Sequence, residues 1–502
     1  MTGEYNVKKI VVIGAGPGGL AASMLLAAKG YDVEVFEKQT YIGGRNGSFQ
    51  LGDYTFDIGP TFLSMPQLVE ELFALVHRNV EDYLELKELK DMYELIFDDK
   101  KLMMTRDEDV MRTRIAKDFP GNERGYERFM RENKTKLNKM TPILQNPMDR
   151  MRDYLSLRVL KALPHLSLSK SLYDVLSCYF TDERLKLAFT FQSKYLGMSP
   201  WECPGAFSIL SYMEHAHGIF HPIGGLNQLP KAMAKITEEY GGRIHLGKGV
   251  KELLLEGKKV TGILLETGET ILADEVIINA DFAHAMTKLI KPGVLKKYSE
   301  EKLEKKKYSC STFMMYVGVK KRYDLPHHTI IFASDYKKNV EEITKTQLLS
   351  EDPSIYVQNA CVTDPTLAPE GKSALYILAP VPNNMSGIDW EENKRAFRNV
   401  ILQTLAEKTG FTDIEEHIEV ERILTPQQWE QDLFVYEGAT FNLGHQLTQM
   451  MYLRPHNRFE ELDNCWLVGG GTHPGSGLPT ILESAKITSR LIEETTGKVV
   501  SV

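Results

Sequence analysis

Cysteine is scarce in this chain of 502 residues. Its five cysteines are scattered, and no two of them have the Cys-x-x-Cys spacing of a zinc or redox site: Cys178, Cys203, Cys310, Cys361 and Cys465. Disulfide frameworks and zinc clusters depend on grouped cysteines, so we expect neither a disulfide framework nor a metal site. An odd number of scattered thiols is typical of a reducing cytoplasm.

Long apolar runs and an excess of positive charge are also missing. No stretch of about 18 consecutive apolar residues occurs, so we expect no membrane-spanning helix. The first apolar strand begins near residue 10, so we expect no signal or transit peptide. The net charge is −8, and because nucleic acids bind basic surfaces, the charge balance argues against a nucleic acid as a partner.

The most informative segment is a glycine-rich turn near the N-terminus. An apolar strand at residues 10–13 leads into Gly14-x-Gly16-x-x-Gly19, a small-residue helix follows, and a second strand ends on Glu37. Gly14 permits the tight turn, Gly16 lets the backbone approach phosphates, and Gly19 lets helix and strand pack closely. The helix N-terminus favours phosphate charge, and Glu37 can accept hydrogen bonds from ribose hydroxyls. This segment therefore predicts a dinucleotide site.

A second strand, glycine-rich turn and helix stand near the C-terminus. A strand is predicted over residues 465–468, the turn covers residues 469–477, and the helix is expected over residues 478–494. Thr480 and Glu483 have the spacing of a capping box at the helix start. The pattern indicates that both ends of the chain contact one ligand, although an ordinary strand-to-helix turn has the same appearance.

The chain between these ends is long enough for more than one globular unit. Residues 76–215 have the three- and four-residue apolar spacing of helices. A helix is predicted over residues 226–239, and residues 308–440 alternate strands with helices. Four short strands are predicted over residues 243–246, 250–255, 260–266 and 275–279.

Together these features resemble the FAD-dependent amine oxidase and phytoene desaturase superfamily, nearly from end to end. Gly43-Gly44-Arg45 after the second strand belongs to the same pattern. Within the superfamily the chain looks most like bacterial carotenoid desaturases, over residues 56–61, 224–229, 308–311, 352–356, 368–371 and 472–475. Residues 308–318 and 472–479 are particularly similar to dehydrosqualene (4,4′-diapophytoene) desaturases, which act on thirty-carbon substrates.

The resemblance implies an α/β fold with a Rossmann-like FAD-binding domain, an intertwined substrate domain and a helical lid. The FAD-binding domain is expected to be discontinuous, over residues 1–75, 222–290 and 445–502. Residues 76–221 are expected to form the helical lid, which faces a membrane. Residues 291–444 are expected to form the substrate-binding sheet domain.

The resemblance also assigns residues to non-covalent FAD. Covalent attachment would need a cysteine in or after the second glycine turn, and Cys465 precedes that turn. The residues expected at the pyrophosphate are Gly14, Ala15, Gly16, Gly18, Gly19, Gly44 and Arg45, with Glu37 at the ribose and Val250 at the adenine. Pro60 and Thr61 are expected to contact the cofactor, and Gly471, Gly477 and Leu478 to lie against the flavin.

The catalytic residues stay open. Desaturation transfers a hydride to the flavin and releases a proton, and a cation flanked by double bonds loses that proton without a strong base. If a base exists, the candidates are the cluster Glu214, His215, His217 and His221, and His473 in the second glycine turn. A purely structural role is the alternative for each of them.

The substrate of such an enzyme dissolves in a bilayer, so the enzyme must reach a membrane. One side of a helix predicted over residues 151–166 carries Met151, Leu155, Val159, Leu163 and Leu166, and Arg150, Arg152, Arg158 and Lys161 lie nearby. A basic amphipathic helix can lie in the membrane interface, and a lid helix packed on the protein is the alternative. We therefore expect a cytoplasmic protein that is peripheral to the inner face of the cell membrane.

The leading function is FAD-dependent desaturation of a long apolar isoprenoid, from dehydrosqualene to diaponeurosporene or diapolycopene. A terminal-methyl apocarotenoid oxygenase shares most of the same stretches and is the first alternative. A non-enzymatic prenyl-binding escort has the same fold, but it needs no intact FAD site, so Gly14, Glu37 and Arg45 argue against it.

Overall fold

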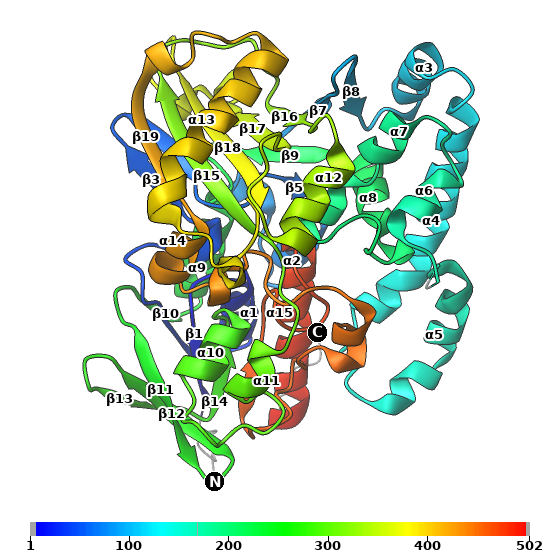
Figure 1. Cartoon of the computed structure of the whole chain (residues 1–502). Helices are drawn as coiled ribbons and strands as arrows, with labels where there is room; N and C mark the ends of the chain where they lie inside the picture. The colour runs from blue at the N-terminus through cyan, green and yellow to red at the C-terminus, as the bar shows by residue number, and fades with distance from the viewer. Residues whose placement is uncertain (1–6, 168, 498–502) are drawn as a thin grey trace.

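The computed structural model describes residues 7–167 and 169–497 (Figure 1). A parallel five-stranded sheet with the order β10-β2-β1-β14-β20 contains the N-terminal glycine turn. Its strands come from distant parts of the chain: β1 (Lys9–Ile13), β2 (Asp32–Phe36), β10 (Arg243–His245), β14 (Glu275–Ile278) and β20 (Cys465–Leu467). All five strands were predicted from the sequence. β1 is buried from its second residue onward, which explains its unbroken apolar sequence.

Three helices pack on one face of this sheet: α1 (Pro17–Ala28), α9 (Gln228–Glu239) and α15 (Leu478–Thr496). Leu20 of α1, Leu229 of α9 and Leu482 of α15 share one apolar cluster with residues of β1. α2 (Pro66–Ala74) joins the same cluster. The helices predicted over residues 226–239 and 478–494 are confirmed, with ends that differ by no more than two residues.

The other face of the five-stranded sheet is covered by a small antiparallel sheet and short helices. These elements are β11 (Val250–Glu256), β12 (Lys259–Leu265), β13 (Thr270–Leu272), α10 (Phe282–Lys288) and α11 (Glu300–Glu304). Ile263 of β12 and Phe282 of α10 pack with Val11 of β1. The sequence predicted β11 and β12 but not β13.

A mixed seven-stranded sheet with the order β19-β15-β18-β17-β16-β7-β8 forms the second large unit. Its strands are β7 (Asp91–Ile96), β8 (Lys101–Thr105), β15 (Ser311–Val319), β16 (His328–Ile331), β17 (Ile355–Asn359), β18 (Ser373–Val381) and β19 (Ile418–Leu424). α13 (Trp390–Thr409) packs on it through Phe397 and Leu405. The expectation of helix over residues 91–105 is wrong, because a tight turn at residues 97–100 folds two short apolar runs into a hairpin that pairs with β16.

The lid helices gather on the right-hand side of Figure 1. They are α3 (Glu108–Asp118), α4 (Glu123–Leu144), α5 (Leu157–Ala162), α6 (Leu172–Ser177), α7 (Glu183–Ala188) and α8 (Ile209–His217). Phe129 of α4 and Leu185 of α7 lie in one apolar cluster with Phe332, which follows β16. The remaining elements are β3 (Ser48–Leu51), β4 (Tyr54–Asp57), β5 (Leu63–Ser64), β6 (Leu86–Glu88), β9 (Ile219–Pro222), α12 (Tyr336–Glu341) and α14 (Pro426–Leu433).

The single helix predicted over residues 151–166 is wrong. The chain forms a 3₁₀ turn, η3 (Met151–Leu155), then α5, then a second 3₁₀ turn, η4 (Leu163–His165), and the backbone of Ser156 between the first two is extended. The break rotates the helical faces, so Val159 and Leu166 are buried whereas Leu157 and Leu160 are exposed. Of the helices among residues 7–167 and 169–497, none is long and apolar enough to cross a bilayer.

Candidate cofactor site

The two glycine turns meet at the carboxyl ends of β1, β14 and β20, around the side chain of Asn279. Asn279 Nδ2 donates a hydrogen bond to Gly14 O at 3.1 Å. A Cβ atom on Gly16 would lie 2.9 Å from that nitrogen, and one on Gly18 would lie 2.8 Å from Asn279 Oδ1. A Cβ on Gly469 would lie 3.3 Å from the same oxygen. Both turns therefore need glycine, and both present bare backbone at one place, as a dinucleotide requires.

Glu37, at the tip of β2, braces the first turn. Its Oε2 accepts a hydrogen bond from Ala15 N at 2.7 Å, and its Oε1 accepts one from Gln39 N at 2.7 Å. Burial raises the pKa of this carboxyl group, although both backbone bonds oppose the shift. Each oxygen keeps a lone pair, so the side chain fits the predicted ribose contact.

Gly43, Gly44 and Arg45 lie beside the first turn. Gly43 N donates to Ala15 O at 2.9 Å, and both glycines have positive φ, which explains their identity. Arg45 Nη1 donates to Thr440 O at 2.7 Å, and Nη2 lies 3.5 Å from an oxygen of Asp281. About a third of the Arg45 side chain is exposed, so donors of its guanidinium stay available for phosphate oxygens.

Asp281 was missed by the sequence analysis. It is buried, it caps α10 through its contact with His284 N, and it accepts a hydrogen bond from Asn442 Nδ2 at 2.8 Å. Burial raises the pKa of its carboxyl group, and the charge of Arg45 opposes this shift. Asn279 and Asp281 follow β14, and their place beside β1 at the carboxyl edge of the sheet is the signal that could have identified them.

The second glycine turn is held by a fully buried arginine. Arg454 donates to Gly470 O at 2.5 Å, to Thr472 O at 3.1 Å and, at 3.5 Å, to three further carbonyls, of Leu443, Gly444 and Gln449. Burial lowers the pKa of its guanidinium to about 10. Because buried arginines are rare in proteins, this side chain marks the turn as a segment whose conformation is strongly specified.

The start of α15 differs from the predicted capping box. The N-cap is Gly477, with φ +114°, and no side chain caps the helix, so its first N–H groups face the glycine turn without a side-chain acceptor. Thr480 Oγ1 donates back to Ser476 O and Gly477 O instead of accepting from the backbone. A free helix N-terminus at Gly477 and Leu478 fits the predicted flavin contact.

Residues 247–250 place Val250 near the tip of β2. Lys248 N donates to Glu37 O at 2.8 Å, and Gly247 N donates to Gln39 O at 2.9 Å. Val250 follows as the first residue of β11. Its position beside Glu37 fits the predicted adenine contact.

The loop at residues 58–61 connects the cofactor site with the seven-stranded sheet. Three tyrosines from neighbouring strands reach it. Tyr316 Oη donates to Ile58 O at 2.5 Å, Tyr376 Oη donates to Gly59 O at 2.6 Å, and Tyr356 Oη lies 2.7 Å from Thr61 Oγ1. A Cβ on Gly59 would lie 2.5 Å from Arg45 O, so the loop that carries Pro60 and Thr61 lies against the backbone of Arg45.

The candidate bases do not converge. Glu214 accepts hydrogen bonds from Tyr93 Oη and Gln192 Nε2, at 2.9 and 2.8 Å. His215 stacks on Phe189, and burial lowers its pKa to about 4.

The other histidines of that cluster point elsewhere. His217 Nδ1 contacts Gln67, and burial also lowers its pKa. His221 Nε2 lies 3.0 Å from Asp364 Oδ2. His473 is buried in the second turn, where its backbone bonds to Pro455 O and Asn457 Nδ2, and burial lowers its pKa to about 4. These surroundings keep His215 and His473 neutral near pH 7.

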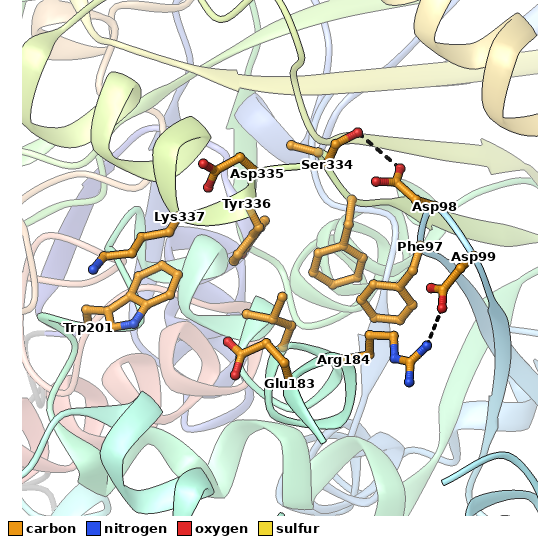
Figure 2. Close-up of a pocket in the computed structure, with 13 residues that line it drawn as sticks. Phe97, Asp98, Asp99, Glu183, Arg184, Trp201, Ser334, Asp335, Tyr336 and Lys337 are labelled. Atoms are coloured by element: carbon orange, nitrogen blue, oxygen red, sulfur yellow. Dashed lines mark hydrogen bonds and ion pairs between the residues drawn. The ribbon is translucent and has the colours of Figure 1, made fainter. Parts of the chain in front are cut away.

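One cavity, away from the glycine turns, has a volume of about 430 Å³. It opens between the lid and the seven-stranded sheet. Figure 2 shows Phe97, Trp201 and Tyr336 around it, with Arg184 and Asp99 joined by an ion pair at the rim. A smaller cavity of about 150 Å³ lies beside Tyr316 and the loop at residues 58–61. In the part of the chain that the structure describes, no group of His, Cys, Asp or Glu side chains could hold a metal ion.

The arrangement of two glycine turns on one Rossmann-like sheet defines a flavin-dependent oxidoreductase, and comparisons with known proteins agree. The chain belongs to the family of flavin-containing amine oxidoreductases, which matches residues 17–492. It is 52% identical over 97% of its length, and 96% of the relative's, to a 4,4′-diapophytoene desaturase (4,4′-diapolycopene-forming) of Methylomonas sp.. It is 38% identical over 98% of its length, and 95% of the relative's, to a zeta-carotene-forming phytoene desaturase of Myxococcus xanthus.

Solved structures confirm the fold. An oxidoreductase from Methanosarcina mazei aligns with a TM-score of 0.64 over 97% of this chain and all of that one, at 17% identity. The predicted FAD dependence, the Rossmann-like fold and membership of the carotenoid desaturases are therefore confirmed. The individual cofactor contacts remain predictions that the geometry fits.

Proposed function

We propose that this protein desaturates dehydrosqualene (4,4′-diapophytoene) to the conjugated polyenes diaponeurosporene and diapolycopene. The observation that carries the proposal is the 52% identity, along nearly the whole chain, with a desaturase of that substrate. Bound FAD would accept the hydride from the substrate. Gly14, Gly16, Gly18 and Gly19 would hold its pyrophosphate together with Arg45, and Glu37 would hold its ribose.

We propose a separate role for each of three parts of the chain. Residues 1–75, 222–290 and 445–502 hold FAD, residues 291–444 provide the sheet that faces the substrate, and residues 76–221 form the lid. A hydrocarbon substrate offers no polar group, so binding depends on apolar burial at roughly 25 cal/mol per Å². The enzyme's task is to place one pair of carbon atoms against the flavin and to exclude water.

A pigment experiment tests this function. The chain is co-expressed with the enzymes that make dehydrosqualene, and the extracted pigments are analysed by absorption spectrum and mass. A product that has lost pairs of hydrogen atoms and absorbs at longer wavelength supports desaturation. A product that has gained oxygen identifies the terminal-methyl oxygenase, and unchanged dehydrosqualene contradicts both functions. A variant with Gly19→Val, whose Cβ would lie 2.4 Å from Gly14 O, is the inactive control.

We also propose that residues 151–163 attach the protein to the inner face of the cell membrane from the cytoplasm. Five large apolar side chains in this segment are exposed: Met151, Leu155, Leu157, Leu160 and Leu163. Leu155 and Leu157 expose 79% and 73% of their surface, the highest fractions among the large exposed apolar residues of the described chain. The segment protrudes at the lower right of Figure 1.

The charge around this apolar patch favours an anionic bilayer as its partner. Arg150, Arg152, Arg158 and Lys161 are exposed on the same segment. Apolar side chains surrounded by basic ones are the pattern of an interfacial anchor, and a hydrophobic substrate gives the enzyme a reason to lie on a membrane. Leu453, beside the Tyr452 ring that contacts Tyr154, extends the exposed apolar surface.

Flotation with vesicles tests the attachment. The protein is mixed with vesicles that contain phosphatidylglycerol and is separated by density. The expected result is co-flotation that is lost in the double variant Arg158→Glu with Lys161→Glu and in Leu155→Ser with Leu157→Ser. The double variant Lys258→Glu with Lys259→Glu, two exposed lysines where the turn after β11 enters β12, should still float. Flotation that is absent in the unchanged protein contradicts the attachment.

A further inference from the structure

A buried polar chain leads away from the loop at residues 58–61. Thr61 Oγ1 lies 2.7 Å from Tyr356 Oη, which lies 2.7 Å from His328 Nδ1. Thr61 and His328 are 4% and 0% exposed. Each hydroxyl group can donate one hydrogen bond and accept another, so a proton can pass along the three groups in sequence.

His327 stands between His328 and the surface, in ring contact with His328. The rings of His327 and His328 lie 4.3 Å apart, centroid to centroid. His327 Nε2 faces the amide nitrogen of Gln358 at 3.4 Å, which leaves its Nδ1–H to donate to Thr363 Oγ1 at 2.8 Å. Thr363 is half-buried and stands next to the exposed Val362, so this end of the chain reaches solvent.

Two atoms along this path are buried without a hydrogen-bond partner among the described residues. They are His328 Nε2 and His221 Nδ1. The His221 ring lies 4.7 Å from that of His327, and its Nε2 faces Asp364. Buried nitrogen atoms of this kind are usually satisfied by ordered water, and water there would close the gap between the two neighbouring rings.

His328 is surrounded by groups from several elements. Tyr356 of β17 bonds to it, His327 precedes β16, and the Phe62 ring lies 4.2 Å from the His328 ring. His221 of β9 contacts His327 and Asp364. The charge of Asp57 acts on Tyr356. Burial and the neighbouring histidines hold the pKa of His328 and His327 well below the usual range. A neutral imidazole with a low pKa can accept a proton and release it without trapping it.

We propose that Thr61, Tyr356, His328 and His327 form the route by which the proton lost from the substrate reaches solvent at Thr363. The inference rests on the proposed desaturase function. In the reaction one C–H bond breaks with its electron pair, which reduces FAD as a hydride. The neighbouring C–H bond breaks, its electron pair forms the new double bond, and its proton enters the route at Thr61 and Tyr356. A reaction site that excludes water needs such an exit for the proton.

The test measures flavin reduction in a single turnover. The FAD-loaded protein is mixed without oxygen with vesicles that contain 4,4′-diapophytoene, and the flavin absorbance is followed in H₂O and D₂O. Tyr356→Phe and Thr61→Val keep shape but remove one hydroxyl group each. We expect each to slow flavin reduction by about 100-fold, which is within the usual contribution of proton transfer by a positioned group. Because Thr61 is also an expected cofactor contact, the rates are compared at equal FAD content, and the melting temperature of each variant should fall by no more than a few degrees.

The solvent isotope effect separates the proton route from a structural role. The unchanged protein should reduce its flavin more slowly in D₂O than in H₂O, and this difference should change in His328→Gln. Tyr336→Phe, a buried tyrosine outside the route, should behave as the unchanged protein. Rates and isotope effects in Tyr356→Phe and Thr61→Val equal to those of the unchanged protein would overturn the route and leave the desaturase function intact. A flavin that diapophytoene never reduces would overturn the function and the route with it.

Discussion

A Cβ atom placed on Gly18 would lie 3.2 Å from the backbone nitrogen of Gly469. The glycine turns from opposite ends of the chain therefore touch, and no side chain separates them. The close contact explains why α1 and α15 are neighbours on the sheet. It also means that the N-terminal and C-terminal segments must fold together before the cofactor site exists.

The contact between the turns gives the first prediction. Gly18→Ala places a methyl group against Asn279 and the backbone of Gly469, so it should widen the site and weaken FAD binding by at least tenfold, or about 1.4 kcal/mol. Titration of the apoprotein with FAD measures the change. Gly30→Asn is the control, because Gly30 faces open space and asparagine tolerates its positive φ. Equal affinity in the Gly18 variant would show that the turns do not enclose the cofactor.

Asp57 should make stability depend on pH. It is buried and accepts hydrogen bonds from Leu226 N and Asn227 N, yet burial raises its pKa to about 6, from 3.8. Because the folded pKa is raised, the stability contributed by the protonated group is complete below pH 3.8 and is lost as the pH rises through 6.

The measurement compares the unchanged protein with Asp57→Asn in urea unfolding. The free energy of unfolding of the unchanged protein, relative to that of the variant, should fall by up to about 3 kcal/mol between pH 4 and pH 6.5. If the free energy of unfolding of the unchanged protein, relative to that of the variant, instead rises over this range, the hydrogen bonds from the two backbone N–H groups lower the pKa of Asp57 more than burial raises it.

Arg454 should be the most sensitive position of the second glycine turn. Arg454→Met removes the donor to Gly470 O and Thr472 O and three longer contacts to carbonyl groups, so we expect the free energy of unfolding to fall by about 3 kcal/mol or more. Arg454→Lys, with three donors, should lose less. Chemical unfolding measures both, and Arg458→Met, an exposed neighbour, should cost less than about 1 kcal/mol. If Arg454→Met and Arg458→Met lower the free energy of unfolding by similar amounts, Arg454 does not hold the second glycine turn.

The tyrosines on the loop at residues 58–61 should act through their hydroxyl groups. Tyr376→Phe removes the donor to Gly59 O and should cost about 1 kcal/mol of stability, and Tyr316→Phe, which frees Ile58 O, should cost about the same. Thermal unfolding of the FAD-loaded protein measures both. Tyr179→Phe, whose hydroxyl bonds to the surface residue Glu132, should be close to neutral. A loss in Tyr179→Phe as large as in Tyr376→Phe would contradict the importance of the loop contacts.

The glycine turns, their strands and their helices could be predicted because local sequence specifies them. Asn279, Asp281 and Arg454 were not identified, because their roles arise from the pairing of β14 with β1 and from a loop distant in sequence. The helix over residues 151–166 failed for a different reason. The apolar spacing favoured one helix, but the break at Ser156 sends Val159 inward and Leu157 outward. Which apolar side chains are exposed thus depends on the extended backbone of Ser156, and the spacing of apolar residues does not predict that conformation.

The central claim is that this flavoprotein takes hydrogen from a thirty-carbon isoprenoid. The most direct measurement mixes the purified, FAD-loaded protein without oxygen with vesicles that contain 4,4′-diapophytoene, and records flavin absorbance and product mass together. We expect the flavin to be bleached while a product two hydrogen atoms lighter forms in equal amount. A flavin that stays oxidised, or a bleached flavin with unchanged diapophytoene, would contradict it.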